Sequence, residues 1–301
     1  MNIQKLWVPV KREIWEYKVG LLWTPAVIAL LIIVSVLYVA IANDYGSLNV
    51  HSEALTIESA EGKSYELSDI LQFLALSSEV KDTFISYFAA AVGALLAIPM
   101  VLVLLVYGHS ALFDDRKNRD ILFWRSMPVS ETQNVLTKLF IMGVVAPTVI
   151  FVLTLACVVT VLLIDICSFA FVEHWQPISI FASLWWPVKI YGGMLFYFIM
   201  LFPLYAWVIF SSAFARKSPF LVSSLIPAML ITVDVLLRKY LVVDLHIVSG
   251  LQRYIDFLDD ITAKNHLVLD AHLVSSFAVA MLVGGVLVLT SIWLRNNRYE
   301  I

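Results

Sequence analysis

Six stretches of the chain are apolar over about 20 consecutive residues, and polar or charged segments separate them. A helix needs roughly 20 apolar residues to cross a hydrocarbon core about 30 Å thick, where no water satisfies an unpaired backbone group. Each stretch therefore predicts a transmembrane helix. The predicted spans cover residues 21–42, 84–108, 139–164, 190–214, 219–237 and 273–294.

The segment before the first span, residues 1–18, repeats apolar side chains at helical spacing with basic residues between them. This pattern predicts an amphipathic helix in the membrane interface, with its basic side chains near the lipid headgroups. Pro9 predicts that this helix breaks or begins there rather than running straight. The apolar positions are Ile3, Leu6, Trp7, Val10, Ile14 and Tyr17, and the basic positions are Lys5, Lys11, Arg12 and Lys18.

The connection between the second and third spans, residues 112–137, is charged at its start and aromatic in its middle. Pro128 predicts the end of a first helix, because proline cannot continue one. Ser130 and Gln133 form an S-x-x-Q pair, which predicts a capping box at the start of the next helix. We therefore expect a helix, a tight turn and a second helix at the membrane surface.

Two other connections are long. Residues 43–83 are enough for a small folded cap, and the stretch 55–67 has a hairpin-like pattern around Glu61 and Gly62. Residues 239–272 contain too many apolar side chains for a freely solvated loop. The whole chain, residues 1–301, is expected to form a single all-α integral membrane domain.

Composition agrees with a membrane protein. Hydrophobic residues make up 61% of the chain, charged residues only 14%, and the mean hydropathy is +0.88, whereas soluble proteins average about 25% charged residues. The net charge is −3 and the basic residues are dispersed. Nucleic acid is therefore not an expected partner, because its phosphates require a basic stripe or patch.

The distribution of basic residues predicts the orientation. If the N-terminus is cytoplasmic, the segments on that side hold 13 of the 20 lysine and arginine residues. Positive charge is retained on the cytoplasmic side of membranes, so both termini are expected in the cytoplasm. A secretory signal cleaved near Ala40 and Ala42 is disfavoured, because the first apolar run exceeds the usual length of about 7–15 residues.

The sequence shows no pattern that indicates catalysis or a metal site. The six histidines are scattered, and Cys157 and Cys167 lie ten residues apart without the spacing of zinc ligands. The Gly-Lys-Ser sequence at 62–64 resembles the end of a phosphate-binding loop, but Ile57 stands where that loop requires a glycine. We expect no catalytic residue, no metal and no cofactor in this chain, and no enzymatic activity of its own.

Few ionisable residues fall in or beside the predicted spans. Asp234 is followed one helical turn later by Arg238, which predicts a local ion pair. Lys189 follows two tryptophans and is typical of an anchor at the outer interface. His109 lies at the inner end of the second span, where we expect a contact with lipid headgroups. These positions do not favour an ion-coupled carrier, which places charges near mid-membrane.

The connection 112–137 resembles the corresponding loop of ABC-2 type exporter permeases, in which a charged stretch leads to an ILFW-S-PVS sequence ahead of the third span. The N-terminal amphipathic helix, the six spans, the inward termini and the outer segment 239–272 are similar to that family as well. The matching residues are Asp115, Arg116, Ile121, Leu122, Phe123, Trp124, Arg125, Ser126, Met127, Pro128, Val129, Ser130 and Lys138.

The resemblance implies the permease subunit of an ATP-binding cassette exporter in a bacterial inner membrane. Two permease copies, or two related permeases, would join two ATPase subunits, which bind ATP and magnesium. The loop after the second span would dock on the ATPase, and segment 239–272 would form short helices that lean on or dip into the outer leaflet. The implied ATPase-coupling residues are Asp115, Arg116, Arg119, Phe123, Trp124, Arg125 and Pro128.

Within this implied coupling segment, we expect Phe123 and Trp124 to contribute most of the docking energy, since burial of a large apolar side chain is worth about 1.5–3 kcal/mol. Charged residues would set the orientation. The substrate-binding residues stay unknown, and the apolar spans favour a hydrophobic or amphiphilic cargo. The alternative function is a membrane anchor or regulatory scaffold without transport activity.

Overall fold

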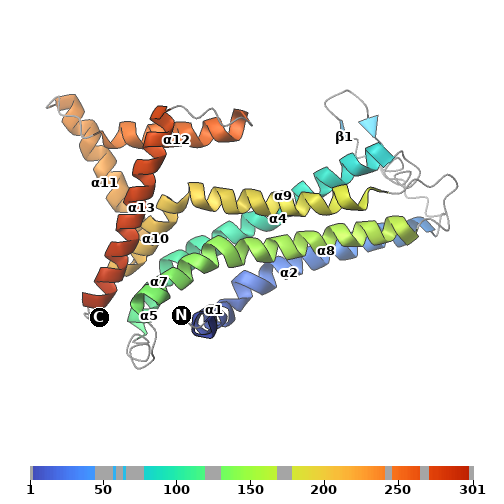
Figure 1. Cartoon of the computed structure of the whole chain (residues 1–301), viewed down its shortest axis with the longest axis horizontal. Helices are drawn as coiled ribbons and strands as arrows, with labels where there is room; N and C mark the ends of the chain where they lie inside the picture. Colours follow the sequence, from blue (N-terminus) through green and yellow to red (C-terminus); the bar gives the residue numbers. More distant parts are fainter. Residues whose placement is uncertain are drawn as a thin grey trace. The chain divides into compact units, whose positions relative to one another are not determined.

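The computed structural model describes residues 3–44, 57–58, 64–65, 78–118, 130–167, 178–240, 246–264 and 271–297. The described chain is helical apart from one short hairpin (Figure 1). The helices are α1 (Ile3–Glu16), η1 (Val19–Trp23), α2 (Thr24–Asp44), α4 (Ser78–Ser110), α5 (Phe113–Lys117), α7 (Glu131–Phe140), η3 (Ile141–Val145), α8 (Ala146–Cys167), α9 (Ile180–Met200), α10 (Phe202–Phe214), α11 (Pro219–Tyr240), α12 (Ile247–Lys264) and α13 (Ala271–Asn297).

Five helical segments of the described chain are long and apolar enough to cross a membrane, which agrees with a multi-pass membrane protein. They coincide with five of the predicted spans. The remaining predicted span, the fourth along the chain at residues 190–214, was expected as one helix and is instead two: α9 begins at Ile180, and α10 follows at a bend of 61°. The five segments are Val19–Ala40, Val80–Lys117, Glu131–Cys167, Pro219–Tyr240 and Phe277–Asn297.

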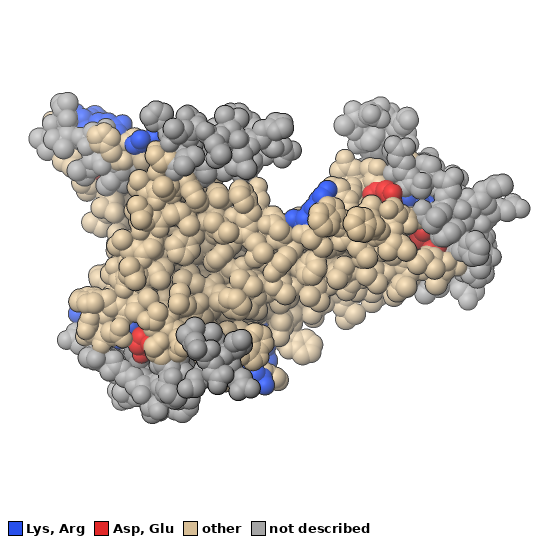
Figure 2. All heavy atoms as spheres, viewed as in Figure 1, with Lys and Arg blue, Asp and Glu red and all other residues tan. Residues whose placement is uncertain are grey.

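Charged side chains are sparse over the helix flanks. On the face that Figure 2 shows, lysine, arginine, aspartate and glutamate form a few small patches, and uncharged residues cover most of the rest of the described surface. Many of these surface residues are large and apolar, among them Leu30, Leu102 and Leu282, each more than half exposed. Such a surface suits a hydrocarbon solvent rather than water.

Two local predictions are decided by the backbone. The hairpin around Glu61 is confirmed, since strand β1 (Ile57–Glu58) pairs antiparallel with β2 (Ser64–Tyr65). The predicted break at Pro9 is wrong, because α1 runs through this residue. Pro9 is the seventh residue of α1, so the helix lacks the hydrogen bond that an N–H at this position would donate to the carbonyl of residue 5, and it continues despite that loss.

The chain forms two compact units, and each is described by itself. Unit 2 comprises Lys18–Val101 and Ala146–Met194. In it α2 packs against α8, and Lys189 lies over the Trp186 ring with its Nζ 4.4 Å from the ring centroid. The core of this unit consists of Ile85, Ala89, Val158, Val161, Leu162 and Ile178, with Val36, Phe88, Leu184, Trp186 and Ile190 packed around it.

A buried ion pair fastens one end of this core. Lys81, near the start of α4, donates from Nζ to Asp165 Oδ1 at 2.8 Å, and both side chains are at most 3% exposed. The other oxygen, Asp165 Oδ2, accepts the Ile178 N–H at 3.2 Å. The residue after Lys81, Asp82, accepts the Ser179 N–H with Oδ1 at 2.9 Å. The two carboxylates thus satisfy backbone donors just ahead of α9.

Unit 1 comprises Met1–Tyr17, Leu102–Val145 and Leu195–Ile301. Helix α10 packs against α11 and α13, α13 also contacts α7 and α12, and α1 contacts α7 and η3. Two glycines permit close helix approach in this unit. A Cβ at Gly143 would lie 2.2 Å from the Phe198 ring, and a Cβ at Gly284 would lie 2.9 Å from the Phe202 ring. Any larger residue at Gly143 therefore displaces an aromatic side chain.

The buried pair in unit 2 supplies a stability prediction. We expect Lys81→Met to cost about 3–5 kcal/mol, because it leaves a carboxylate buried without its cation. The double variant Lys81→Met/Asp165→Asn should recover part of this loss, since it removes both charges and keeps an oxygen for the Ile178 N–H. Thermal unfolding in detergent measures both, with Asp82→Asn as a control near wild type, because asparagine keeps the oxygen that accepts the Ser179 N–H. A double variant less stable than Lys81→Met would contradict the prediction.

Candidate functional site

The predicted coupling segment begins in α5 and ends at the start of α7. Asp115 and Arg116 lie in α5, whereas Arg119, Phe123, Trp124, Arg125 and Pro128 lie outside the described residues. The capping box at the start of α7 is confirmed. The Gln133 N–H donates to Ser130 Oγ, and the Ser130 N–H donates to Gln133 Oε1, both at 3.2 Å.

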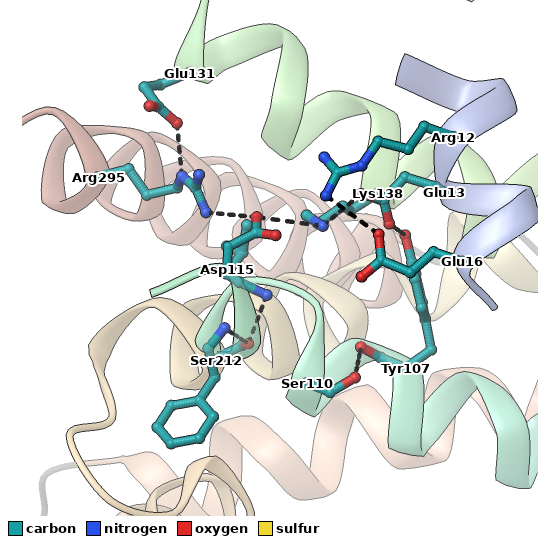
Figure 3. A network of polar contacts seen from close by, with 12 residues as sticks. Arg12, Glu13, Glu16, Tyr107, Ser110, Asp115, Glu131, Lys138, Ser212 and Arg295 are labelled. Atoms are coloured by element: carbon teal, nitrogen blue, oxygen red, sulfur yellow. Dashed lines mark hydrogen bonds and ion pairs between the residues drawn. The ribbon is translucent and has the colours of Figure 1, made fainter. Parts of the chain in front are cut away.

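Asp115 is the centre of a buried network of charges in unit 1 (Figure 3). Its side chain is 6% exposed, and Oδ2 lies 3.2 Å from Arg295 Nη1 and 3.5 Å from Lys138 Nζ. Lys138 lies in the last turn of α7, and Arg295 lies in the last turn of α13. One carboxylate therefore joins α5 to two other helices.

Both cations have a second carboxylate partner. Lys138 Nζ donates to Glu13 Oε1 at 2.8 Å, and Arg295 Nε donates to Glu131 Oε2 at 2.7 Å. The Tyr107 hydroxyl, from α4, donates to Glu13 Oε2 at 3.0 Å. Glu13 belongs to α1 and is 3% exposed. The network therefore connects α1, α4, α5, α7 and α13, and residues close to both ends of the chain meet within it.

Arg116 fastens α5 to a different helix. Its Nη2 donates to Ser212 O at 2.7 Å and to Ala215 O at 2.8 Å, two carbonyls at the C-terminal end of α10. Such carbonyls have no donor inside their own helix, so a guanidinium satisfies them well. The Ser212 hydroxyl accepts the N–H groups of Leu112 and Phe113 at 3.1 and 3.0 Å. Asp115 and Arg116 thus both point into unit 1 rather than away from it.

The end of α1 carries two groups with shifted ionisation. Burial, and then the neighbouring Glu13 carboxylate, raises the pKa of Glu16 above its ordinary value, against an ion pair with Arg12 at 3.4 Å. Burial raises the pKa of Tyr17 to about 12, and its hydroxyl lies 3.1 Å from Ser110 Oγ. Tyr17 therefore keeps its proton at physiological pH and stays available for a hydrogen bond with α4.

No protein-family model, curated protein or solved structure matches the chain. The resemblance of residues 112–137 to ABC-2 permeases therefore rests on the residues of the chain itself. Among the described residues, no group of three or more histidine, cysteine, aspartate or glutamate side chains has the arrangement of a metal site. The absence of a metal or cofactor in the whole chain stays a prediction.

The sequence indicated Asp115, Arg116 and Lys138 but not the role of Glu13. Glu13 stands three residues after Val10 and four before Tyr17, so helical spacing places this acid on the side of α1 that packs. Trp7 and Trp15 face outward and are 58% and 62% exposed. An acidic residue on the buried side of an amphipathic helix needs a partner of opposite charge, and this pattern in the sequence could have identified Glu13.

Two further polar residues make contacts within unit 1 that the sequence did not predict. His109, expected to contact headgroups, has Nδ1 2.6 Å from Leu105 O and Nε2 2.7 Å from Ser223 Oγ. Asp234 is fully buried, and its Oδ2 accepts the Val248 N–H at 2.9 Å. The contacts His109–Ser223 and Asp234–Val248 each reach across more than a dozen residues of sequence, beyond the range of helical spacing.

The two glutamates of α1 provide a matched test of the network. We expect Glu13→Gln to lower the free energy of unfolding by about 3–5 kcal/mol, because Lys138 loses a buried partner. Glu16→Gln should change it by no more than about 0.5 kcal/mol, because the Glu16 side chain is 40% exposed and its loss leaves no charge buried without a partner. Denaturant or thermal unfolding in detergent measures both. Equal effects of the two variants would show that burial of Glu13 does not govern the stability of α1.

The Glu16 carboxyl also predicts a pH dependence. Since its pKa is higher in the folded chain than in the unfolded one, the folded state binds the proton more tightly. The ionised form therefore costs stability above the folded-state pKa, and this cost disappears as the pH falls through that value toward the unfolded-state value. In Glu16→Gln this contribution should be absent. Unfolding curves of wild type and variant that change in parallel over this range would contradict it.

Proposed function

We propose that the chain is the membrane-spanning permease subunit of an ABC exporter, energised by a separate ATPase subunit. The ILFW-S-PVS sequence between α5 and α7 carries this proposal. The geometry of unit 1 supports it, because the charge network holds both α5 and α7, the helices that precede and follow residues 119–129 in the sequence. A movement of the ATPase bound to this segment would then displace α5 and α7.

The charge network also supports six membrane crossings with both chain ends on one side. Glu13, Asp115, Lys138 and Arg295 meet in one cluster, so each segment between them must leave and return to the same side. Helices α2 and α4 lie between Glu13 and Asp115 and make two crossings. Between Lys138 and Arg295 lie α8, the bent pair α9 and α10, α11 and α13, and their number is even only if the bent pair counts as one.

The side on which this cluster lies is proposed to be the cytoplasm of a bacterial cell, with the chain in the inner membrane. Lysine and arginine are retained on that side. Exposed cations lie at this end, namely Lys117 in the last turn of α5 and Arg216 and Lys217 just after α10. An ATPase in the cytoplasm would approach the chain from this side.

In this proposal the coupling residues divide into two groups. Phe123 and Trp124 would dock on the ATPase, because burial of large apolar side chains supplies most of the energy of such contacts. Asp115 and Arg116 would act from inside the fold, since they are engaged with Arg295, Lys138 and the end of α10. They would transmit displacement rather than bind the partner.

A second permease copy, or a related one, would complete the path, and ATP and magnesium would bind to the partner ATPase. The cargo class that fits the apolar span surfaces is hydrophobic or amphiphilic. The alternative, an anchor or regulatory scaffold, requires the same membrane fold but no ATPase contact. Binding of the ATPase through residues 119–129 is therefore the observation that separates the two.

The test is a pull-down with the ATPase subunit that this proposal requires. The double variant Phe123→Ala/Trp124→Ala should lose at least about tenfold in binding, since two buried side chains are worth more than about 1.4 kcal/mol together. Its unfolding midpoint should stay unchanged. The control Phe181→Ala truncates an aromatic side chain that is 82% exposed on α9 and should bind normally. Undiminished binding by the double variant would exclude this segment as the docking element.

The variant Arg116→Ala distinguishes a role in holding α5 against α10 from a role in binding the ATPase. We expect a lower unfolding midpoint, because two carbonyls at the end of α10 lose their donor. Weaker ATPase binding should accompany it only in proportion to the unfolded fraction. A variant of wild-type stability that nevertheless loses the ATPase would place Arg116 in the docking surface itself.

A further inference from the structure

The bend between α9 and α10 rearranges backbone hydrogen bonds in unit 1. In an unbroken helix, the Leu204 N–H donates to Met200 O. Here it donates to Leu201 O at 2.9 Å, one residue closer. Pro203 has no N–H, so the carbonyl four residues before it also lacks its helical donor. The break thus frees carbonyl oxygens in an apolar stretch of the chain, where an unsatisfied acceptor is costly.

A side chain from α12 satisfies one of these oxygens. The Tyr254 hydroxyl donates to Met200 O, and the side chain is 7% exposed. Burial raises the pKa of Tyr254, so the hydroxyl remains protonated and is a donor at physiological pH. The only role that requires a tyrosine rather than a phenylalanine at this position is this hydrogen bond, since the two rings pack alike.

A second contact holds the beginning of α12. Asp234, fully buried in α11, accepts the Val248 N–H with Oδ2 at 2.9 Å. The first N–H groups of a helix have no internal partner, and a carboxylate there satisfies one and interacts favourably with the helix dipole. Helix α12 also packs against α11 and α13 (Figure 1). It is therefore fastened at its start to α11 and in its middle to the bend.

We propose that α12 is a latch for the bent span: docking of α12 through Tyr254 and Asp234 and the bend between α9 and α10 form one two-state element. When α12 is docked, Tyr254 satisfies Met200 O and the bend is stable. When α12 separates from the bend, Met200 O needs another donor. The nearest is the Leu204 N–H, which donates to Met200 O when α9 and α10 form one straight helix. Each state therefore satisfies this carbonyl once, and intermediate geometries leave it without a donor.

This inference does not depend on the ATP-driven function proposed above. It requires only the contacts of α12 with the bend and with α11. An ATP-driven exporter, an anchor and a scaffold would all carry the same latch. What differs among them is the event that releases α12.

Hydrogen exchange of the chain in nanodiscs tests whether Tyr254 and Asp234 hold α12 in its docked position. Tyr254→Phe should accelerate exchange of the α12 amides about tenfold, the ratio that corresponds to about 1.4 kcal/mol. Asp234→Ala should do the same through the other contact, and it replaces Tyr254→Phe if that variant does not fold. The control Tyr240→Phe removes a hydroxyl from a side chain that is 70% exposed, and its α12 exchange should match wild type.

A distance between two spin labels tests whether the bend between α9 and α10 straightens. Labels at Val188 and Phe214, which are 40% and 39% exposed on α9 and α10, report the distance across the break in a cysteine-free background. At a rise of about 1.5 Å per residue, straightening the bend lengthens this distance by about 5 Å. Tyr254→Phe should populate the longer distance, and Pro203→Ala, which restores an N–H, should do so as well.

The coupling itself is decided by the two measurements together. The latch predicts that Tyr254→Phe changes α12 exchange and the spin-label distance, and that its effect on exchange shrinks in the Pro203→Ala background. Faster α12 exchange with an unchanged distance would show that α12 and the bend are independent, and it would overturn the proposal. No change in either measurement would overturn it as well, because the hydroxyl would then hold nothing.

Discussion

A charged side chain inside an apolar protein must lie against an opposite charge, and this constraint organises the fold. Transfer of an ion out of water costs several kcal/mol even after relaxation, and only close partners offset it. In unit 1, Glu13, Asp115, Lys138 and Arg295 are at most 5% exposed. None of them is tolerable alone, so the helices that carry them must meet where their charges meet. Packing of apolar flanks by itself specifies no such meeting point, because lipid is as apolar as leucine.

The same constraint explains why the ion pairs lie near helix ends. Lys81 and Asp165 in unit 2 lie within the first and last turns of α4 and α8, and Lys138 and Arg295 in unit 1 lie in the last turns of α7 and α13. Helix ends already carry unsatisfied backbone groups, so a polar cluster there serves side chains and backbone together. Asp165 illustrates this, because one of its oxygens binds Lys81 and the other binds a backbone N–H.

Local features of the chain followed from the sequence, whereas contacts between distant segments did not. Span positions, the Ser130 cap and the hairpin at 57–65 depend on residues within about 20 positions of one another, and their patterns are readable. The continuous helix through Pro9 and the break near Pro203 show the limit of such patterns. The local sequence does not distinguish the two prolines, and at the break a freed carbonyl needs a donor from elsewhere. Tyr254 supplies one at the break, 54 residues away in sequence, which no local pattern shows.

Helix α10 connects the two polar ends of unit 1. At its C-terminal end, Arg116 and the Ser212 hydroxyl tie it to the region of α5. At its N-terminal end, the carbonyl of Met200 is held by Tyr254 of α12. A helix of 13 residues is about 20 Å long and rigid along its axis, and Gly284 brings α13 against its first turn. Because side chains from other segments fix both ends of α10, a displacement of α5 along this axis must either move the bend or break the contacts of Arg116. The hydrogen bonds at the two ends of α10 therefore set how far movement at one end of unit 1 reaches the other.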